Sequence, residues 1–483
     1  MIPILRPYQE DLRQTLNVAW RYIYRSVILV LSTGAGKTTI FTQVLKDAEM
    51  DGMSVWVIAH RQELVRQASN TLDRFEVTHG IVKAGELFQP EKVTQVASIQ
   101  TLVRRLQKLT PPDLIIADEC HHTLSASWKK VFDAFPEASI LGVTATPIRT
   151  NGAGLGQIFQ HMVQGPSNTW LTGQGYLCPA RYFAPPMKAD LSNVPSRGGD
   201  YAAEALEEVM DENTITGDAI AHYKRICDGV PMLVCCTSIA HAKHVAEEYQ
   251  KAGYRAVSVD GTMSDEDRED RITGLGTGKY QVLTFCDLIG EGLDVPAATA
   301  IQFLRPTKSL ILHLQFIGRV LRAIYGDGYD LETAEGRLAA IANGPKPFAY
   351  ILDHVGNTSK HEFASTERQW SLEGTKKRPS SGSEIATRTC GDCFSVHKTS
   401  PACPFCGYLY PIKSKSLTSM KMVDGELVEV EQTKEERQEE VQKARSFSEL
   451  KAIAVARGYK RPHFWALKTL RSRPVSLSLL PRL

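Results

Sequence analysis

The sequence predicts an α/β protein built on parallel sheets. Residues 27–31 and 114–117 are apolar runs that suit strands buried on both faces of such a sheet. Each run leads directly into polar residues, and ligands of parallel sheets gather beyond the carboxyl ends of the strands. Further along, helices and strands alternate again, with strands expected at residues 232–236 and 280–285. We therefore expect a second α/β unit in the same chain.

The segment after the first strand has the pattern of a P-loop. Small residues allow backbone N–H groups to wrap a phosphate at the start of the next helix, where Lys37 reaches the terminal phosphates and the Thr38 hydroxyl joins a Mg²⁺ shell. The first glycine of the general pattern is Leu31 here. The nucleotide-binding residues expected from this loop are Ser32, Thr33, Gly34, Ala35, Gly36, Lys37, Thr38 and Thr39.

The second strand ends in a pair of acids, Asp118 and Glu119. Two adjacent carboxylates can mark a solvated turn, but a nucleotide-bound Mg²⁺ is the usual partner of such a pair in phosphoryl-transfer sites. The P-loop upstream favours the second interpretation. Asp118 is then an expected metal ligand together with Thr38.

With these motifs the chain resembles the superfamily 2 helicases of the DEAD/DEAH type, and its box reads Asp118-Glu119-Cys120-His121. The resemblance covers most of about the first 370 residues in motif order. Within the superfamily the chain is similar to the group of type III restriction motor subunits, RadD-type bacterial helicases and phage-encoded DNA helicases. This implies two tandem RecA-like lobes, at residues 1–185 and 186–378, with Glu119 as the catalytic base.

The resemblance implies roles for three more groups of residues in the first lobe. Arg6, Tyr8 and Gln9 would recognise the adenine; His60, Arg61 and Thr101 would contact the nucleic-acid backbone; and His121, Thr144 and Thr146 would couple the nucleotide site to the bound strand. The stretch that holds Thr101 can equally be read as a plain helix start.

In the second lobe the resemblance implies three further groups. Thr237 and Ser238 would meet the strand backbone, Gly292 and Asp294 would face the ribose and phosphates of ATP, and Gln315, Arg319 and Arg322 would act in catalysis. Arg319 and Arg322 are three residues apart and share a helix face, so they could also form a solvated stripe. Following a complete P-loop lobe, they are better read as arginine fingers.

A zinc ribbon is expected at residues 384–412. Two Cys-x-x-Cys pairs, Cys390 with Cys393 and Cys403 with Cys406, have the spacing of two knuckles that share one tetrahedral Zn²⁺. The segment is too short to bury a core of its own, so the metal would supply its folding free energy.

A helical segment is expected at 426–483. Basic and aromatic residues around Tyr459 and Trp465 could either contact nucleic acid or pack on the motor.

Composition sets the remaining expectations. The net charge is +2 in 483 residues, so a nucleic-acid surface must come from local clustering of basic residues. The chain has no apolar run of membrane-spanning length and no signal-peptide architecture, which predicts a cytoplasmic protein without membrane contact. The expected cofactors are ATP, Mg²⁺ and Zn²⁺.

The resemblance implies an ATP-driven helicase or translocase that favours DNA over RNA and works in DNA repair, recombination or replication. Two alternatives are open at this point. One is the motor of a restriction complex, which would need a nuclease partner; a protein partner could bind through the ribbon or the tail. The other is an ATPase switch, gated by nucleic acid, that does not unwind it.

Overall fold

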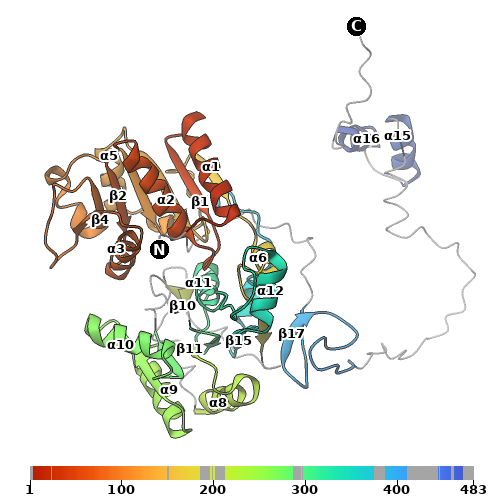
Figure 1. Cartoon of the computed structure of the whole chain (residues 1–483). Coiled ribbons are helices and arrows are strands. Elements are labelled where there is room, and N and C mark those ends of the chain that lie inside the picture. The colour runs from red at the N-terminus through yellow and green to blue at the C-terminus, as the bar shows by residue number, and fades with distance from the viewer. Residues whose placement is uncertain are drawn as a thin grey trace, which may run out of the picture. The chain divides into compact units, whose positions relative to one another are not determined.

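The computed structural model describes residues 4–22, 24–149, 152–184, 196–197, 200–201, 213–286, 295, 297–374, 387–410, 444, 447–457 and 462–471. The chain forms two compact units, Met1–Tyr410 and Pro411–Leu483, and each is treated by itself (Figure 1). Within the first unit two sheets with their helices form a first and a second lobe.

The first lobe contains a seven-stranded sheet in the order β3-β4-β2-β5-β6-β1-β7, and all its strand pairs are parallel. Its strands are β1 (Ser26–Val30), β2 (Val55–Ala59), β3 (Gly80–Val82), β4 (Thr94–Ser98), β5 (Leu114–Asp118), β6 (Ser139–Thr144) and β7 (His161–Gln164). Its helices are α1 (Pro7–Tyr22), α2 (Lys37–Met50), α3 (Gln62–Arg74), α4 (Ile99–Leu102) and α5 (Ala126–Ala134), with short 3-10 turns η1 (Leu106–Lys108) and η2 (Cys120–His122).

The central strands are mostly apolar because both sheet faces are covered. Leu29 of β1 belongs to the hydrophobic core under α1, α2 and α3, whereas its neighbours Ile28 and Val30 belong to the core under α4 and α5. Successive side chains of a strand point to opposite faces, so a strand covered on both faces buries every residue. The expected buried strands at residues 27–31 and 114–117 are confirmed as β1 and β5.

The second lobe contains an eight-stranded sheet in the order β12-β13-β11-β14-β15-β8-β17-β16. Its strands are β8 (Ala180–Phe183), β11 (Met232–Cys235), β12 (Ala256–Val259), β13 (Val282–Phe285), β14 (Ala300–Phe303), β15 (Ala349–Asp353), β16 (Thr387–Thr389) and β17 (Ser395–Lys398). The nearby helices are α6 (Asn168–Gly173), α8 (Asn213–Cys227), α9 (Ile239–Lys251), α10 (Asp265–Gly276), α11 (Leu310–Val320), α12 (Ala334–Ala342) and α13 (Asn357–His361), and β9 (Ser196–Arg197) pairs with β10 (Asp200–Tyr201) in a separate ribbon.

One face of this second sheet packs on α8 and α9, and the other packs on α10 and α11. The core under α10 and α11 is continuous with that under α1, α2 and α3 of the first lobe, so a single hydrophobic core reaches across both sheets. This continuity holds α11 beside the edge of the first sheet that carries the P-loop.

The second sheet includes two strands, β8 and β14, that the sequence prediction misplaces or misses. The sequence places β8 at the end of the first lobe, but β8 pairs in parallel with β15 in the second sheet. The sequence does not predict β14, which lies between β11 and β15. Its four residues include the polar Gln302, whose amide is satisfied internally by Tyr249 and the Ala219 carbonyl.

The cysteine-rich segment continues the second sheet. β17 pairs antiparallel with β8, and β16 pairs antiparallel with β17. The preceding stretch returns to the first lobe, where Trp370 and Leu372 pack on the core under α4 and α5. Gly154 permits this return, because a Cβ there would lie 2.1 Å from the Leu372 carbonyl oxygen.

In the second unit, α15 (Phe447–Ala456) and α16 (Pro462–Arg471) pack on each other around Leu450 and Ala466. Most of residues 426–445 and all of residues 458–461, which include Tyr459, lie outside the described residues. Among the helices that the structure describes, none is both long enough and apolar enough to cross a membrane.

Candidate nucleotide site and nucleic-acid interface

The P-loop connects β1 to α2 with two glycines in the left-handed region. Gly34 and Gly36 both have φ +86°, a conformation that side chains with a Cβ rarely adopt. A Cβ on Gly36 would also lie 2.3 Å from the Gln9 amide nitrogen. Helix α2 begins at Lys37, immediately after this turn. The free N–H groups of its first turn therefore lie at the loop, as phosphate binding requires.

Asp118 and Glu119 lie where β5 ends. Glu119 has φ +47°, which is unusual for a residue other than glycine, and it is largely buried. Its N–H donates to the Asp118 carboxylate over 3.0 Å. Both residues line one cleft, so the sharp turn keeps two neighbouring carboxylates at the same site.

Glu119 is also tied to the end of β6. The Thr144 hydroxyl donates to the Glu119 carboxylate at 3.4 Å, and His121 Nδ1 lies 3.4 Å from both of these groups. The backbone N–H of Thr146 donates to the Thr144 hydroxyl. The Thr146 hydroxyl itself is buried and has no hydrogen-bond partner within the described residues. The expected bridge to His121 is therefore made by Thr144 and not by the Thr146 hydroxyl.

A cavity of about 450 Å³ lies between the two lobes at this point. Its lining includes Lys37, Asp118 and Glu119 from the first lobe, Arg319 from α11, and Arg322 just beyond the end of that helix. Arg319 is nine-tenths buried, so a solvated stripe is ruled out for this residue. The structure thus brings the P-loop, the acid pair and both arginines to one cavity.

Most of the expected P-loop residues line this cavity, namely Thr33, Gly34, Gly36, Lys37, Thr38 and Thr39. The other two, Ser32 and Ala35, are not part of the lining. Ser32 lines a smaller neighbouring cavity of about 70 Å³, and Ala35 is fully buried beneath the loop.

Gly318 explains how closely α11 approaches the P-loop. A Cβ on Gly318 would lie 2.3 Å from Cβ of Thr33, well inside any contact distance. A Cβ on Gly34 would lie 3.3 Å from Cγ of Arg322. Both glycines therefore allow α11 and the loop to lie against each other.

The charges in the cavity perturb one another. Burial lowers the pKa of Lys37, while Glu119 and Asp118 oppose that shift. Burial and the adjacent Glu119 raise the pKa of Asp118 to about 6. A carboxylate in this position is stabilised by a cation, and Thr38 lines the same cavity. This donor set, one carboxylate and one hydroxyl beside phosphate-binding N–H groups, fits Mg²⁺.

One residue expected in catalysis does not line the cavity. Gln315 of α11 is fully buried, and neither polar atom of its amide has a hydrogen-bond partner in the described part of the chain. Two residues expected to bind nucleotide, Gly292 and Asp294, lie outside the described residues.

The residues expected to recognise adenine lie against the P-loop. The Tyr8 hydroxyl and the Gln9 amide both donate to the Ala35 carbonyl, at 2.7 and 3.1 Å. The Gln9 amide oxygen accepts from the Arg6 N–H. In this structure the two ends of the Gln9 amide therefore bind the protein backbone. The Arg6 guanidinium lies 4.9 Å from the ring centre of Tyr176, which also packs on Tyr8.

The expected nucleic-acid contacts of the first lobe share the carboxyl edge of its sheet. His60 and Arg61 follow β2, and Thr101 lies in α4, directly after β4. The Gln100 amide donates to the His60 carbonyl and joins the two loops.

A row of imidazoles connects this edge with the acid pair. The centre of the His60 ring lies 4.0 Å from that of His122, which lies 4.1 Å from that of His121. His121 in turn contacts Glu119. The row therefore reaches from the sheet edge to the cavity between the lobes.

In the second lobe, Thr237 and Ser238 precede α9 directly. The Ser238 hydroxyl accepts from the His241 N–H, and the Thr237 hydroxyl lies 2.7 Å from the His241 ring. Both side chains thus hold the start of the helix in this structure, at the carboxyl end of β11.

The four expected zinc ligands gather in one place. The sulfur atoms of Cys390, Cys393, Cys403 and Cys406 all lie within 4.8 Å of one another. The Cys390–Cys406 and Cys393–Cys403 sulfur distances are 3.6 and 3.7 Å. Tetrahedral Zn²⁺ with bonds of ~2.3 Å separates its sulfur ligands by ~3.8 Å, so the arrangement fits that ion. His397 instead pairs with the Tyr410 hydroxyl.

Ion pairs that the sequence does not signal join the lobes beside the cavity. Arg268 of α10 binds Glu63 of α3 at 2.8 Å, and Arg66 binds Glu269 at 3.3 Å. These partners lie about 200 residues apart in the chain, and only the fold identifies them.

Comparison with known proteins agrees with this geometry. Residues 2–149 match the family described as type III restriction enzyme, res subunit, and residues 219–324 match the helicase conserved C-terminal domain. A 51.5 kDa protein of a Lactococcus phage is 29% identical over 404 residues, which cover 83% of this chain and 82% of that protein.

A Saccharomyces cerevisiae protein named as ATP-dependent helicase IRC3 is 28% identical over 342 residues, which are 66% of this chain and 50% of that protein. Among solved structures, a fragment of a type I restriction enzyme HsdR subunit from Vibrio vulnificus superposes with a TM-score of 0.56 at 18% identity. That superposition covers 75% of this chain and 67% of the other, and it shows two RecA-like lobes as the common fold.

Proposed function

We propose that this chain is a DNA translocase or helicase, an ATP-dependent nucleic-acid motor of the superfamily 2 helicase type with restriction-enzyme relatives. The observation that carries the proposal is the cavity between the lobes, lined by the P-loop and the acid pair of one lobe and by two arginines of the other. A site divided in this way is complete only when the lobes are together, so hydrolysis can drive their relative movement.

In the proposed reaction, Lys37 and the N–H groups at the start of α2 hold the terminal phosphates of ATP. Thr38 and Asp118 would hold Mg²⁺, which neutralises phosphate charge. Glu119 orients the attacking water and accepts its proton. Arg319 and Arg322 stabilise the charge that develops as the terminal phosphoryl group leaves.

The contacts of Glu119 support a route from hydrolysis to the bound strand. Its carboxylate lies in hydrogen-bond reach of Thr144 and His121. The His122 ring lies between the rings of His121 and His60, tilted against both, and so connects Glu119 with the sheet edge. A displacement of Glu119 during ATP hydrolysis would be transmitted through these three imidazole rings to the bound nucleic acid.

We place the nucleic acid across the carboxyl edges of both sheets. The residues proposed to contact it are His60, Arg61 and Thr101 in the first lobe and Thr237 and Ser238 in the second. Movement of the lobes would then shift the strand.

DNA is favoured over RNA because the matching family model describes a restriction enzyme subunit. The same match supports a second candidate, a motor that works beside a nuclease on another chain and binds that nuclease through the ribbon or the second unit.

We propose that the motor works in DNA repair, recombination or replication, and the similarity to helicases supports this proposal. Four thiolates at the observed spacing support one structural Zn²⁺.

ATP hydrolysis with and without nucleic acid tests the proposal. We expect single-stranded DNA to stimulate the steady-state rate several-fold, and RNA of the same sequence to stimulate it less. Glu119→Gln should abolish the stimulated rate in the same preparation. An ATPase that is indifferent to DNA, or that responds only to RNA, would reject DNA as the track.

A further inference from the structure

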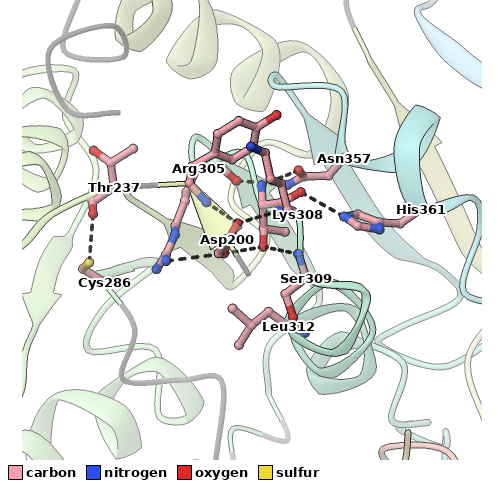
Figure 2. A network of polar contacts seen from close by, with 11 residues as sticks. Asp200, Thr237, Cys286, Arg305, Lys308, Ser309, Leu312, Asn357 and His361 are labelled. Carbon is pink, nitrogen blue, oxygen red and sulfur yellow. Dashed lines mark hydrogen bonds and ion pairs between the residues drawn. The ribbon is translucent and has the colours of Figure 1, made fainter. Parts of the chain in front are cut away.

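A carboxylate is bound at the carboxyl edge of the second sheet, away from the ATP cavity. Figure 2 shows Asp200 between the residues that follow β14. One Asp200 carboxylate oxygen accepts from the Lys308 backbone N–H at 2.5 Å, and the other accepts from the Thr307 hydroxyl at 2.7 Å. The guanidinium of Arg305 lies 3.8 Å from the same carboxylate, with a side chain that is nine-tenths buried.

The loop that binds Asp200 is held in shape by other residues. The Asn357 amide accepts from the Thr307 N–H at 2.9 Å and donates to the Arg305 carbonyl at 3.0 Å. The His361 ring lies 2.9 Å from the Thr307 carbonyl, and the Ser309 N–H donates to the Thr307 hydroxyl (Figure 2). The donors are thus positioned by α13 and by the loop itself. They form a preorganised anion site whichever anion occupies it.

Three basic side chains lie around this site. Besides Arg305, the ammonium groups of Lys308 and Lys360 lie 4.2 and 5.0 Å from the ring centre of Tyr201, the residue after Asp200. Burial lowers the pKa of Lys360, and the nearby Lys308 lowers it further. These groups would favour a ligand with negative charge.

The place of the site in the fold indicates what else could bind there. Thr237, after β11, and Cys286, after β13, lie at the same edge, and the Cys286 thiol donates to the Thr237 carbonyl (Figure 2). Ligands of parallel sheets bind beyond this edge.

The site also adjoins the helix that reaches the ATP cavity. Ser309 caps the first turn of α11, and the same helix carries Arg319 into the cavity. At ~1.5 Å per residue, Ser309 and Arg319 lie ~15 Å apart along one rigid element. A change of ligand at the start of α11 can therefore shift the position of Arg319 near the end of the helix.

We propose that Arg305, Thr307 and Lys308 form a binding site for a backbone phosphate of single-stranded DNA, and that Asp200 occupies this site as an internal competitor. The oxygens of a phosphodiester can accept the hydrogen bonds that the Asp200 carboxylate oxygens accept in this structure. DNA must then displace Asp200 to reach the loop. The inference rests on the proposed function, because it names the phosphate contact through which α11 would report bound DNA to the ATP site.

Binding of a fluorescent 20-nucleotide oligo-dT, followed by anisotropy at two salt concentrations, tests the inference. Asp200→Asn removes the competing charge, so affinity should rise roughly 10-fold. Asp200→Glu keeps the charge and should not tighten binding to that extent. Asp327→Asn removes the same charge at an exposed position elsewhere in this lobe and should change little. Adding Thr307→Val to Asp200→Asn should cancel the gain, because the phosphate then loses its hydroxyl donor.

Lys308→Gln provides an independent test if Asp200→Asn does not fold. The Asp200 carboxylate is bound by the backbone N–H of Lys308, which this substitution retains. A phosphate site predicts weaker DNA binding and a salt dependence reduced by about one counterion. Unchanged DNA affinity in Lys308→Gln would overturn the inference. An Asp200→Asn protein with a lower melting temperature and no gain in DNA affinity would also overturn it, because Asp200 would then only stabilise the fold.

The ATPase of the same proteins separates this inference from the proposed function. If Asp200→Asn binds DNA more tightly while DNA leaves the ATPase rate unchanged, the phosphate site stands and the motor fails. If DNA stimulates the ATPase while neither substitution changes affinity, the motor stands and the phosphate site fails.

Discussion

Glu119 combines an unusual backbone conformation with a side chain in the lining of the cavity. Its φ of +47° costs conformational free energy, of the order of 1 kcal/mol. The strained turn places the Glu119 carboxylate beside Thr144 and His121 and in the lining of the ATP cavity. Because this carboxylate is buried in the cavity lining, it is not a solvated acidic turn, and its position agrees with the proposed role of catalytic base.

Glu119→Gln should therefore retain ATP binding and lose hydrolysis by roughly 100- to 10,000-fold, because the amide cannot accept the proton of the attacking water. Nucleotide affinity and steady-state turnover, measured on the same protein, test this. Glu76→Gln is a matched control, since Glu76 also has a positive φ, +59°, but is exposed and is not part of the cavity lining. Normal turnover in Glu119→Gln would remove Glu119 from the mechanism.

Lys346 should make the stability of the fold depend on pH. It is fully buried, its ammonium donates to the Ala298 carbonyl, and burial lowers its pKa from 10.5 to about 8. Between pH 8 and 10.5 the unfolded chain then holds a proton that the folded chain has released. The unfolded state binds more protons, so the free energy of unfolding should rise with pH over this window.

The urea midpoint at pH 8 and at pH 10 measures this effect. The wild-type chain should gain more stability between the two values than Lys346→Met, which has no proton to release there. Tyrosines and the other lysines also titrate in this window, but they are present in both proteins. An identical pH dependence in the two proteins would contradict the shifted pKa of Lys346.

At the scale of elements, α11 connects two sites, with Ser309 at its start, Arg319 in its last turn and Arg322 just beyond. Its approach to the P-loop depends on Gly318, where a Cβ would lie 2.3 Å from Thr33. Gly318→Ala must therefore displace either the helix or the loop. A shift of this size at a catalytic site is expected to lower turnover roughly 10- to 100-fold.

The matched control for Gly318→Ala is Gly276→Ala at the end of α10, where the nearest atom to a new Cβ is 3.6 Å away. Turnover and melting temperature are measured for both variants. We expect the Gly318 variant to lose turnover with a smaller change in stability, and the Gly276 variant to behave like wild type. Equal turnover in both would show that α11 need not touch the P-loop.

The four-cysteine cluster should hold about one zinc per chain, because four thiolates fill one tetrahedral shell. Metal analysis of the purified protein measures this. Cys403→Ser should lose the metal and lower the melting temperature, since β17 covers the edge of β8. Cys286→Ser changes a cysteine outside the cluster and should keep the zinc. Zinc-free protein prepared without chelators would exclude the ribbon.

The elements that the sequence predicts well have local signals. β1 and β5 are continuous apolar runs, and the P-loop is a contiguous motif. β14 escapes prediction because it is short and holds Gln302, a polar residue that the fold satisfies with Tyr249 and a backbone carbonyl. The partner of β8 escapes prediction because pairing in a parallel sheet connects strands that are distant in the chain.

For the whole molecule, the sequence predicts two lobes. It also predicts the P-loop and acid pair of the first lobe and the two arginines of the second, which the structure brings to one cavity. It does not predict the Arg268–Glu63 ion pair or the contact of Asp200 with the loop after β14. In both cases the partners are joined by tertiary structure alone and carry charges that are common on any surface. The sequence motifs can be recognised because their residues lie close together in the chain. Contacts between the lobes cannot be predicted in this way, because their partners are distant in the chain.

If closure of the cleft moves the chain along DNA, that movement can be measured without requiring strand separation. The measurement is displacement of a short third strand from a DNA triplex, followed by stopped-flow fluorescence after ATP is added. We predict ATP-dependent displacement whose delay grows with the length of the DNA track, and none with Glu119→Gln. DNA-stimulated ATP hydrolysis without any displacement would contradict the proposed translocation and identify the protein as a nucleic-acid-gated ATPase switch.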